Sequence, residues 1–188
     1  MSEDTLETKL PVFSRVSGTR PRITSMVNRS LFIDSGLVVA ELGNTCVAIW
    51  REEPYQFLFD RQASALRQVV EGRDEKTAFL CVVEKSSPPP KEDLRKAAVR
   101  MLEEHAKQLA CVACVIAGDG FRSAITRSVL SGLSLLYGSR EFPTKLTNSV
   151  HNAAQWMTTY VHLGVVASYV ESVEAYRSLM TECNEVRR

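Results

Sequence analysis

The chain has 188 residues, of which 45% are apolar and 24% charged, a composition typical of one soluble globular domain with a sizeable core. Its 23 basic and 22 acidic side chains nearly cancel, so no overall field would draw the protein to nucleic acid or to an anionic membrane. No apolar run has the length of a transmembrane helix, and the polar start MSEDTLETK does not have the pattern of a signal peptide. We therefore expect a cytoplasmic protein that binds neither membranes nor nucleic acid.

Residues 1–35 are predicted to form a mostly irregular N-terminal arm. The stretch KLPVFSRVSGTRPRITSMVNRS contains two prolines, one glycine and four serines without a clean period. Arg15, Arg20, Arg22 and Arg29 make the arm locally basic, which would suit an acidic partner or nucleic acid. Aromatic residues are nearly absent from it, however, so we interpret the arm as a solvated extension of the domain.

An α/β domain is predicted over residues 36–162, and it opens with a β-hairpin. The apolar segments GLVVAEL and TCVAIWR flank Gly43-Asn44, a two-residue connection that favours positive φ and tight hairpin turns. Strands over 37–42 and 45–51 should therefore pair antiparallel. Pro54 follows the second strand, and proline cannot donate to a sheet ladder.

Helical and strand patterns then alternate along the chain. The apolar spacing predicts helix 55–71, strand 77–84, a helix from about 91, strand 110–117, a further helix, strand 144–147 and a helix from about 149. Such alternation is typical of a sheet with helices packed on it, and helical crossovers make parallel neighbours. We expect a mixed α/β sheet of four or five strands with flanking helices, in which strands 77–84 and 110–117 are parallel neighbours.

Residues 163–188 are predicted to form a C-terminal amphipathic helix. One face of it carries a wide apolar stripe: Val166, Tyr169, Val170, Val173, Tyr176 and Met180. Exposed apolar patches of several hundred Å² are rare on monomers, so something must cover this stripe. The helix either packs on its own domain or forms the interface of a homodimer or of a complex with another protein.

Four of the five cysteines lie in apolar strand candidates: Cys46, Cys81, Cys111 and Cys114. The spacing of Cys111 and Cys114 is C-x-x-C, but a zinc site needs a second ligand pair, and none of the three histidines has a matching spacing. Residues three apart in a strand point to opposite faces of the sheet. We therefore predict core packing for these cysteines, with no metal site and no cofactor.

Gly118, Asp119, Gly120, Arg122 and Ser123 form a candidate ligand site. They lie where a strand ends and a helix begins, a place where free backbone N–H groups suit an anion. The string is only a weak relative of the dinucleotide fingerprint, because it follows a late strand and no acidic strand end lies about 20 residues on. A small-ligand or nucleotide-binding domain centred here, with or without enzymatic activity, is the alternative functional hypothesis.

No complete catalytic set is visible in the sequence. Seven residues separate Cys114 from Arg122, where a phosphatase loop needs five, and the chain has no G-x-S-x-G elbow. His105 completes the apolar stripe of its predicted helix, which favours a packed core histidine. We therefore predict no catalytic residues.

Three segments, FLCVVEK, LACVACVIAGDGFRSAITRSVLSGLSLL and FPTKLTNSVHNAAQWM, carry a family resemblance over about residues 36–160. Their order resembles the STAS-type fold of anti-sigma-factor antagonists and of uncharacterised STAS-like proteins from delta-proteobacteria. The resemblance implies a non-enzymatic regulatory or scaffold module that binds another protein. It also implies a phosphorylated serine where a helix follows the third strand, a position held here by Ser86 and Ser87. Three prolines replace the usual Asp-Ser-Ser-Gly string at this point.

Overall fold

The computed structural model describes residues 28–118 and 141–185, with side chains described as far as Met180. In chain order the elements are β1 (Asn28–Ile33), β2 (Leu37–Leu42), β3 (Thr45–Trp50), α1 (Gln56–Glu71), β4 (Thr77–Val83), α2 (Glu92–Glu104), β5 (Leu109–Ile116), β6 (Thr144–Thr147), α4 (Val150–Met157) and α5 (Val166–Glu185). The six strands form one sheet in the order β1-β2-β3-β4-β5-β6. Pairing is antiparallel from β1 to β3 and parallel from β3 to β6, so the predicted mixed α/β class with an opening hairpin and flanking helices is confirmed.

The strand count was predicted incorrectly, because the sheet has six strands instead of four or five. The additional strand is β1, which lies within the arm over residues 1–35 that was predicted to be mostly irregular. In the described sheet β1 pairs only with β2, and its register shifts between Ser30 and Phe32. A half-exposed edge strand with such an irregularity loses the alternation by which strands are recognised.

The hairpin between β2 and β3 turns as its sequence predicts. Gly43 has a φ of 55°, which a residue without a Cβ adopts at little cost. The Asn44 side chain donates a 2.7 Å hydrogen bond to the Lys76 carbonyl and so fastens the turn to the start of β4. Behind the turn, the buried Glu41 carboxylate accepts from both Arg29 and Arg73.

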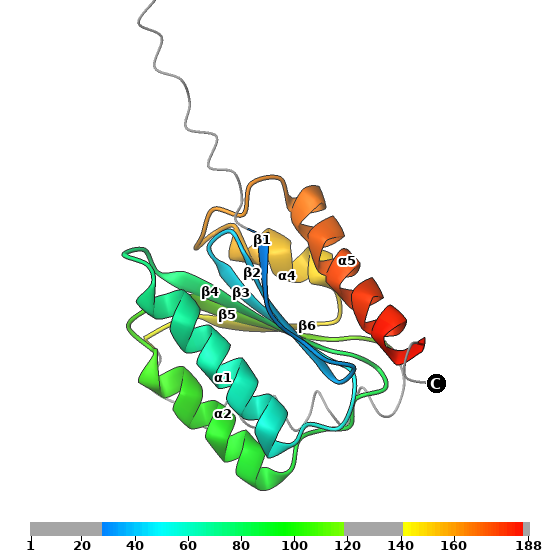
Figure 1. Ribbon diagram of the computed structural model, residues 1–188. Coiled ribbons are helices and arrows are strands. Elements are labelled where there is room, and N and C mark those ends of the chain that lie inside the picture. Colours follow the sequence, from blue (N-terminus) through cyan, green and yellow to red (C-terminus); the bar gives the residue numbers. More distant parts are fainter. Residues whose placement is uncertain (1–27, 119–140, 186–188) are drawn as a thin grey trace, which may run out of the picture.

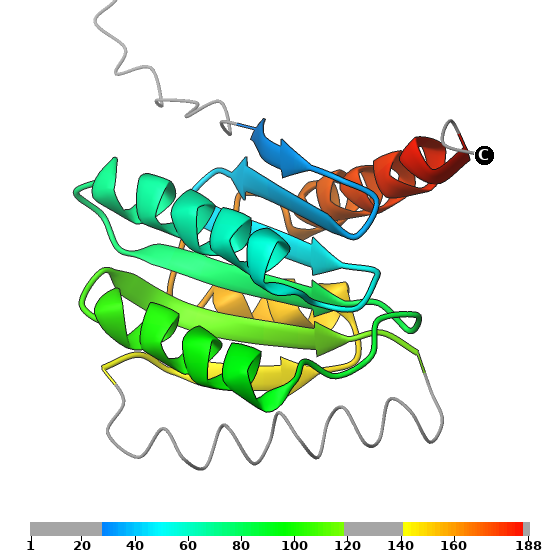
Figure 2. The same ribbon diagram turned by 60° about the horizontal axis from the view of Figure 1, so that its bottom comes forward.

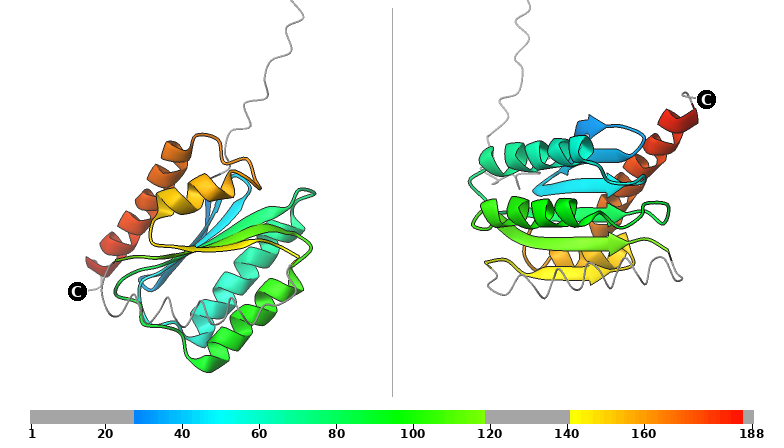
Figure 3. Two further views of the ribbon diagram at one scale, coloured as in Figure 1. Left: turned by 180° about the vertical axis from the view of Figure 1, so that it is seen from behind. Right: turned by 90° about the horizontal axis from the view of Figure 1, so that it is seen from below.

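Helices cover both faces of the sheet, α1 and α2 on one face and α4 and α5 on the other (Figure 1). The β3-α1-β4 and β4-α2-β5 crossovers advance in the same direction along the sheet. Because such crossovers are right-handed, both helices lie on the same face. Figure 2 shows α1 and α2 side by side in front of the strands, and Figure 3 shows α4 and α5 from behind.

The central strands are buried on both faces, as parallel strands between two helical layers usually are. Val82 and Val115 belong to the core beneath α4 and α5. Phe79 and Val112 belong to the second core, beneath α1 and α2. Burial on both faces explains why β4 and β5 are nearly unbroken apolar runs in the sequence.

The apolar stripe of α5 packs on the sheet of its own chain. Tyr169, Val173 and Met180 have no exposed surface and belong to the same core as the inner strands. The Arg177 guanidinium also holds the helix, donating from Nη2 to the Glu84 carboxylate at the end of β4 over 2.7 Å. A homodimer through this stripe has no support in the structure and stays a prediction.

Candidate functional site

The carboxyl ends of β3, β4 and β5 meet at one edge of the sheet. Trp50, Val83 and Ile116 share a register position there, one at the end of each strand. Open α/β sheets usually bind ligands at this edge, in the crevice where the strand order reverses. The strand order in the described sheet never reverses, so no crevice of the dinucleotide-binding type is formed.

Gly118 lies just beyond this edge with a φ of 85°, a backbone conformation that residues other than glycine rarely adopt. A Cβ at this position would also meet the Lys85 side chain at 3.1 Å. Asp119, Gly120, Arg122 and Ser123 lie outside the described residues. A ligand site at residues 118–123 therefore remains a prediction from the sequence.

Ser86 and Ser87 fasten the loop after β4 to the end of β3. The Ser86 hydroxyl donates to the Arg51 carbonyl over 2.7 Å, and the Ser87 hydroxyl donates to the Glu52 carbonyl over 2.8 Å. Ser86 is exposed, whereas only 6% of Ser87 is exposed. The helix α2 begins at Glu92, so neither serine lies at the helix N-terminus where the resemblance would place a phosphorylated residue.

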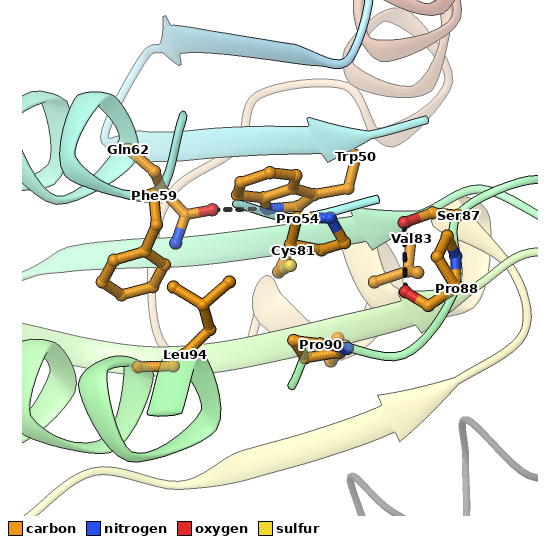
Figure 4. A pocket seen from close by; sticks show the side chains of 12 residues that line it. Trp50, Pro54, Phe59, Gln62, Cys81, Val83, Ser87, Pro88, Pro90 and Leu94 are labelled. Carbon is orange, nitrogen blue, oxygen red and sulfur yellow. Dashed lines mark hydrogen bonds between the residues drawn. The ribbon is translucent and has the colours of Figure 1, made fainter. Parts of the chain in front are cut away.

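A cavity of about 100 Å³ opens at the same edge, beneath the N-terminal turns of α1 and α2 (Figure 4). We call it the edge pocket. Its lining is Trp50, Pro54, Phe59, Gln62, Cys81, Val83, Ser87, Pro88, Pro90, Leu94, Ala98 and Cys114. The pocket combines residues of three strands with two helices and two proline-bearing loops, and this combination has no signature in the linear sequence.

One buried hydrogen bond orders the wall of the edge pocket on the α1 side. The indole Nε1 of Trp50 donates to the Gln62 side-chain oxygen over 2.7 Å, and Figure 4 shows the two groups pointing toward each other. The Gln62 amide nitrogen in turn lies 3.7 Å from the Met101 sulfur. Because these polar atoms are paired with one another, the surface left facing the cavity is mostly apolar.

Two thiols lie side by side in the pocket. Cys81 and Cys114 are register partners on β4 and β5. A hydrogen bond with Cys81, reinforced by burial, raises the pKa of the Cys114 thiol well above its usual value. The Cys114 side chain is therefore a neutral hydrogen-bonding group at neutral pH.

The C-x-x-C pair is divided by the sheet, as the strand geometry predicts. Cys111 belongs to the core beneath α4 and α5, and burial raises the pKa of its thiol to about 12. Cys114 faces the edge pocket on the opposite side. Within residues 28–118 and 141–180, no three His, Cys, Asp or Glu side chains gather as metal ligands would.

A second feature lies on the surface between β1 and the start of α1. We call the group of Phe32, Tyr55, Phe57 and Arg61 the aromatic–arginine surface. The ring centroids of Phe32 and Phe57 are 6.5 Å apart, edge to face, and Tyr55 stacks on Phe57 at the same separation. The Arg61 guanidinium lies 4.9 Å from the Phe57 ring centroid and 5.9 Å from that of Phe32. Tyr55 and Phe57 are each 51% exposed.

Comparisons with protein-family models, with curated proteins and with solved structures give no match to this chain. The resemblance to anti-sigma-factor antagonists therefore stays a prediction. In the part of the chain that the structure describes, no helix is both long and apolar enough to cross a membrane.

Proposed function

We propose that the protein is a regulatory or scaffold module of the cytoplasm that binds an extended segment of another protein along β1. The observation that carries this proposal is the aromatic–arginine surface. Phe32, Phe57 and Arg61 gather on the outside of the domain, and aromatic and arginine side chains are the residue types that dominate binding energy at protein interfaces. Large rings that are half exposed and clustered favour a docking function over a purely structural one.

The edge strand supplies the second part of the docking surface. β1 pairs with β2 on one side only within the described sheet, which leaves the outward backbone groups of β1 able to pair with another strand. Asn28, Arg29, Ser30 and Ile33 are exposed, so neither a described helix nor a described loop covers this edge. A partner segment could add a seventh strand here, with its backbone giving affinity and its side chains giving specificity.

The side chains beside β1 define the chemistry of that segment. Its apolar side chains would rest on the half-exposed ring of Phe57 and on the partly buried ring of Phe32 beside it. Arg61 is exposed, and no ion pair joins it to a carboxylate among the described residues. The complementary partner is therefore an extended apolar strand that carries an Asp or Glu opposite Arg61.

Site-specific photo-crosslinking in the native host tests this proposal. A photoreactive amino acid replaces Phe57 in one variant and Gln68 in a control variant. Gln68 is exposed on the same helix, three turns or about 16 Å along the axis from Phe57. The proposal predicts a defined protein adduct from position 57 that position 68 does not give.

The captured protein is then purified and its affinity measured. Phe57→Ala and Arg61→Glu should each weaken binding by about tenfold or more, because both remove a central contact. Gln68→Ala should leave the affinity unchanged. Identical adducts from positions 57 and 68, or equal affinities for all three variants, would contradict the proposal.

A further inference from the structure

We propose that the edge pocket is a binding site for a small apolar molecule, of the size of one aromatic ring or a short aliphatic chain, seated against the thiols of Cys81 and Cys114. This inference does not rest on the proposed protein-binding function. Phe59 and Gln62 line the pocket, whereas Phe57 and Arg61 belong to the aromatic–arginine surface. The two sites therefore use different residues of α1 and can be tested separately.

The rigidity of the walls keeps the cavity open. Pro54, Pro88 and Pro90 line the pocket, and proline has a fixed φ that limits collapse of the backbone into the space. The Ser87 hydroxyl fixes the same loop to the Glu52 carbonyl. The Trp50 indole is held by its hydrogen bond to Gln62. Protein interiors are otherwise densely packed, so a cavity kept open by prolines and by side-chain hydrogen bonds is an unusual feature of this core.

The lining selects an apolar ligand. Trp50 and Gln62 satisfy each other, and the Ser87 hydroxyl is already bonded to backbone, so a polar guest would find few free partners. Phe59, Val83 and Leu94 supply apolar contact surface. An apolar guest costs none of the existing hydrogen bonds and removes further apolar surface from water.

The size of the cavity sets the size of the guest. Its volume of about 100 Å³ is of the same order as an apolar protein cavity of about 150 Å³ that takes up benzene. A fused-ring cofactor or a long fatty acyl chain would not fit in this space. One ring or a short alkyl group would.

The paired thiols give the site its particular character. Cys81 and Cys114 lie on central strands and yet remain only half-buried, because the cavity exposes them. A free cysteine is polarisable and behaves as a small hydrophobe, so these two side chains suit an apolar guest. Occupancy of the pocket should therefore shield these two cysteines from solvent reagents.

Titration of the full-length protein with benzene, followed by methyl NMR, tests the proposal. Saturable shifts are expected for the methyl groups of Val83, Leu94 and Ala98. Ala98→Leu fills the cavity and should weaken benzene binding at least tenfold. Ala97→Leu is the matched control, because Ala97 is half-buried on the same helix but does not line the pocket.

Alkylation of the cysteines by iodoacetamide at alkaline pH, which favours the reactive thiolate form, provides a second readout. Benzene at ten times its dissociation constant should slow modification of Cys81 and Cys114 about elevenfold, if only the free protein reacts.

Non-saturating shifts spread over the surface, or equal binding by the Ala98→Leu variant, would overturn the proposal. A third result would also overturn the proposal: no benzene binding, together with loss of binding of the crosslinked protein partner in the Ala98→Leu variant. The pocket would then receive a side chain of the partner. Benzene binding without any protein partner would instead contradict only the proposed function.

Discussion

The hydrogen bond between Trp50 and Gln62 is the residue-level contact on which the edge pocket most depends. Both residues are at least 95% buried, so each polar atom would lack a water partner if the other were removed. We predict that Gln62→Leu lowers the free energy of unfolding by about 1–3 kcal/mol, the usual cost of leaving a buried donor unpaired. Urea denaturation measures this change.

The same measurement in a Trp50→Phe background separates the hydrogen bond from the packing of the two side chains. Phenylalanine has no N–H to leave unpaired, so Gln62→Leu should cost clearly less there than in the wild-type background. Equal costs in the two backgrounds would show that the bond contributes nothing beyond packing.

His105 is the buried ionisable residue for which the structure predicts a pH dependence. Burial lowers the pKa of this imidazole, an effect that Arg67 reinforces and that Glu104 and Glu71 oppose. The unfolded chain therefore binds a proton at higher pH than the folded protein does. Stability should be fully present at neutral pH and should fall as the pH drops below about 6.5.

A His105→Gln variant isolates this contribution to acid sensitivity. Between pH 7.5 and 5, the urea midpoint of the wild-type protein should fall further than that of the variant, because glutamine takes up no proton. Parallel curves for the two proteins would mean that His105 does not contribute to the pH dependence.

At the scale of elements, the position of α5 depends on an ion pair as well as on apolar burial. Arg177 donates to Glu84 from both Nε and Nη2, and the two side chains are only 27% and 12% exposed. The Glu84 carboxylate, followed by the Glu174 carboxylate, raises the pKa of the guanidinium, which stays charged at all ordinary pH values. We predict that Arg177→Ala destabilises the protein by about 1–2 kcal/mol, between the values typical of exposed and of buried pairs.

The Lys96–Glu92 pair on α2 is the matched control for Arg177. Its side chains are 62% and 68% exposed, so Lys96→Ala should leave the melting temperature unchanged. A loss of stability in the Arg177→Ala variant no larger than that in the Lys96→Ala variant would contradict the assigned role of Arg177.

Elements with a strong internal pattern could be predicted from the sequence, and the edge strand could not. β4 is an apolar run between clear breaks. The N-cap of α4 is Ser149, whose side chain accepts a hydrogen bond from the Asn152 backbone as a capping serine should. β1 has exposed residues, a register shift and a single neighbour, so its conformation follows from pairing with β2 and not from its own sequence.

At the scale of the whole molecule, both surface features arise from residues far apart in the chain. Cys81 and Cys114 become neighbours only when β4 and β5 pair in parallel with one particular register. Phe32 meets Phe57 only because β1 lies at the edge and α1 covers the adjacent face. The sequence patterns predict the layers that create these sites but carry no information on which side chains meet across them.

Hydrogen exchange of β1 in the presence of the crosslinked partner is the most direct test of the proposed function. We expect the β1 amides not bonded to β2 to exchange rapidly in the free protein and to slow markedly in the complex, while the amides of the buried strand β4 do not change. Slowing of exchange at another surface, with β1 unchanged, would contradict the claim that this edge receives the partner strand.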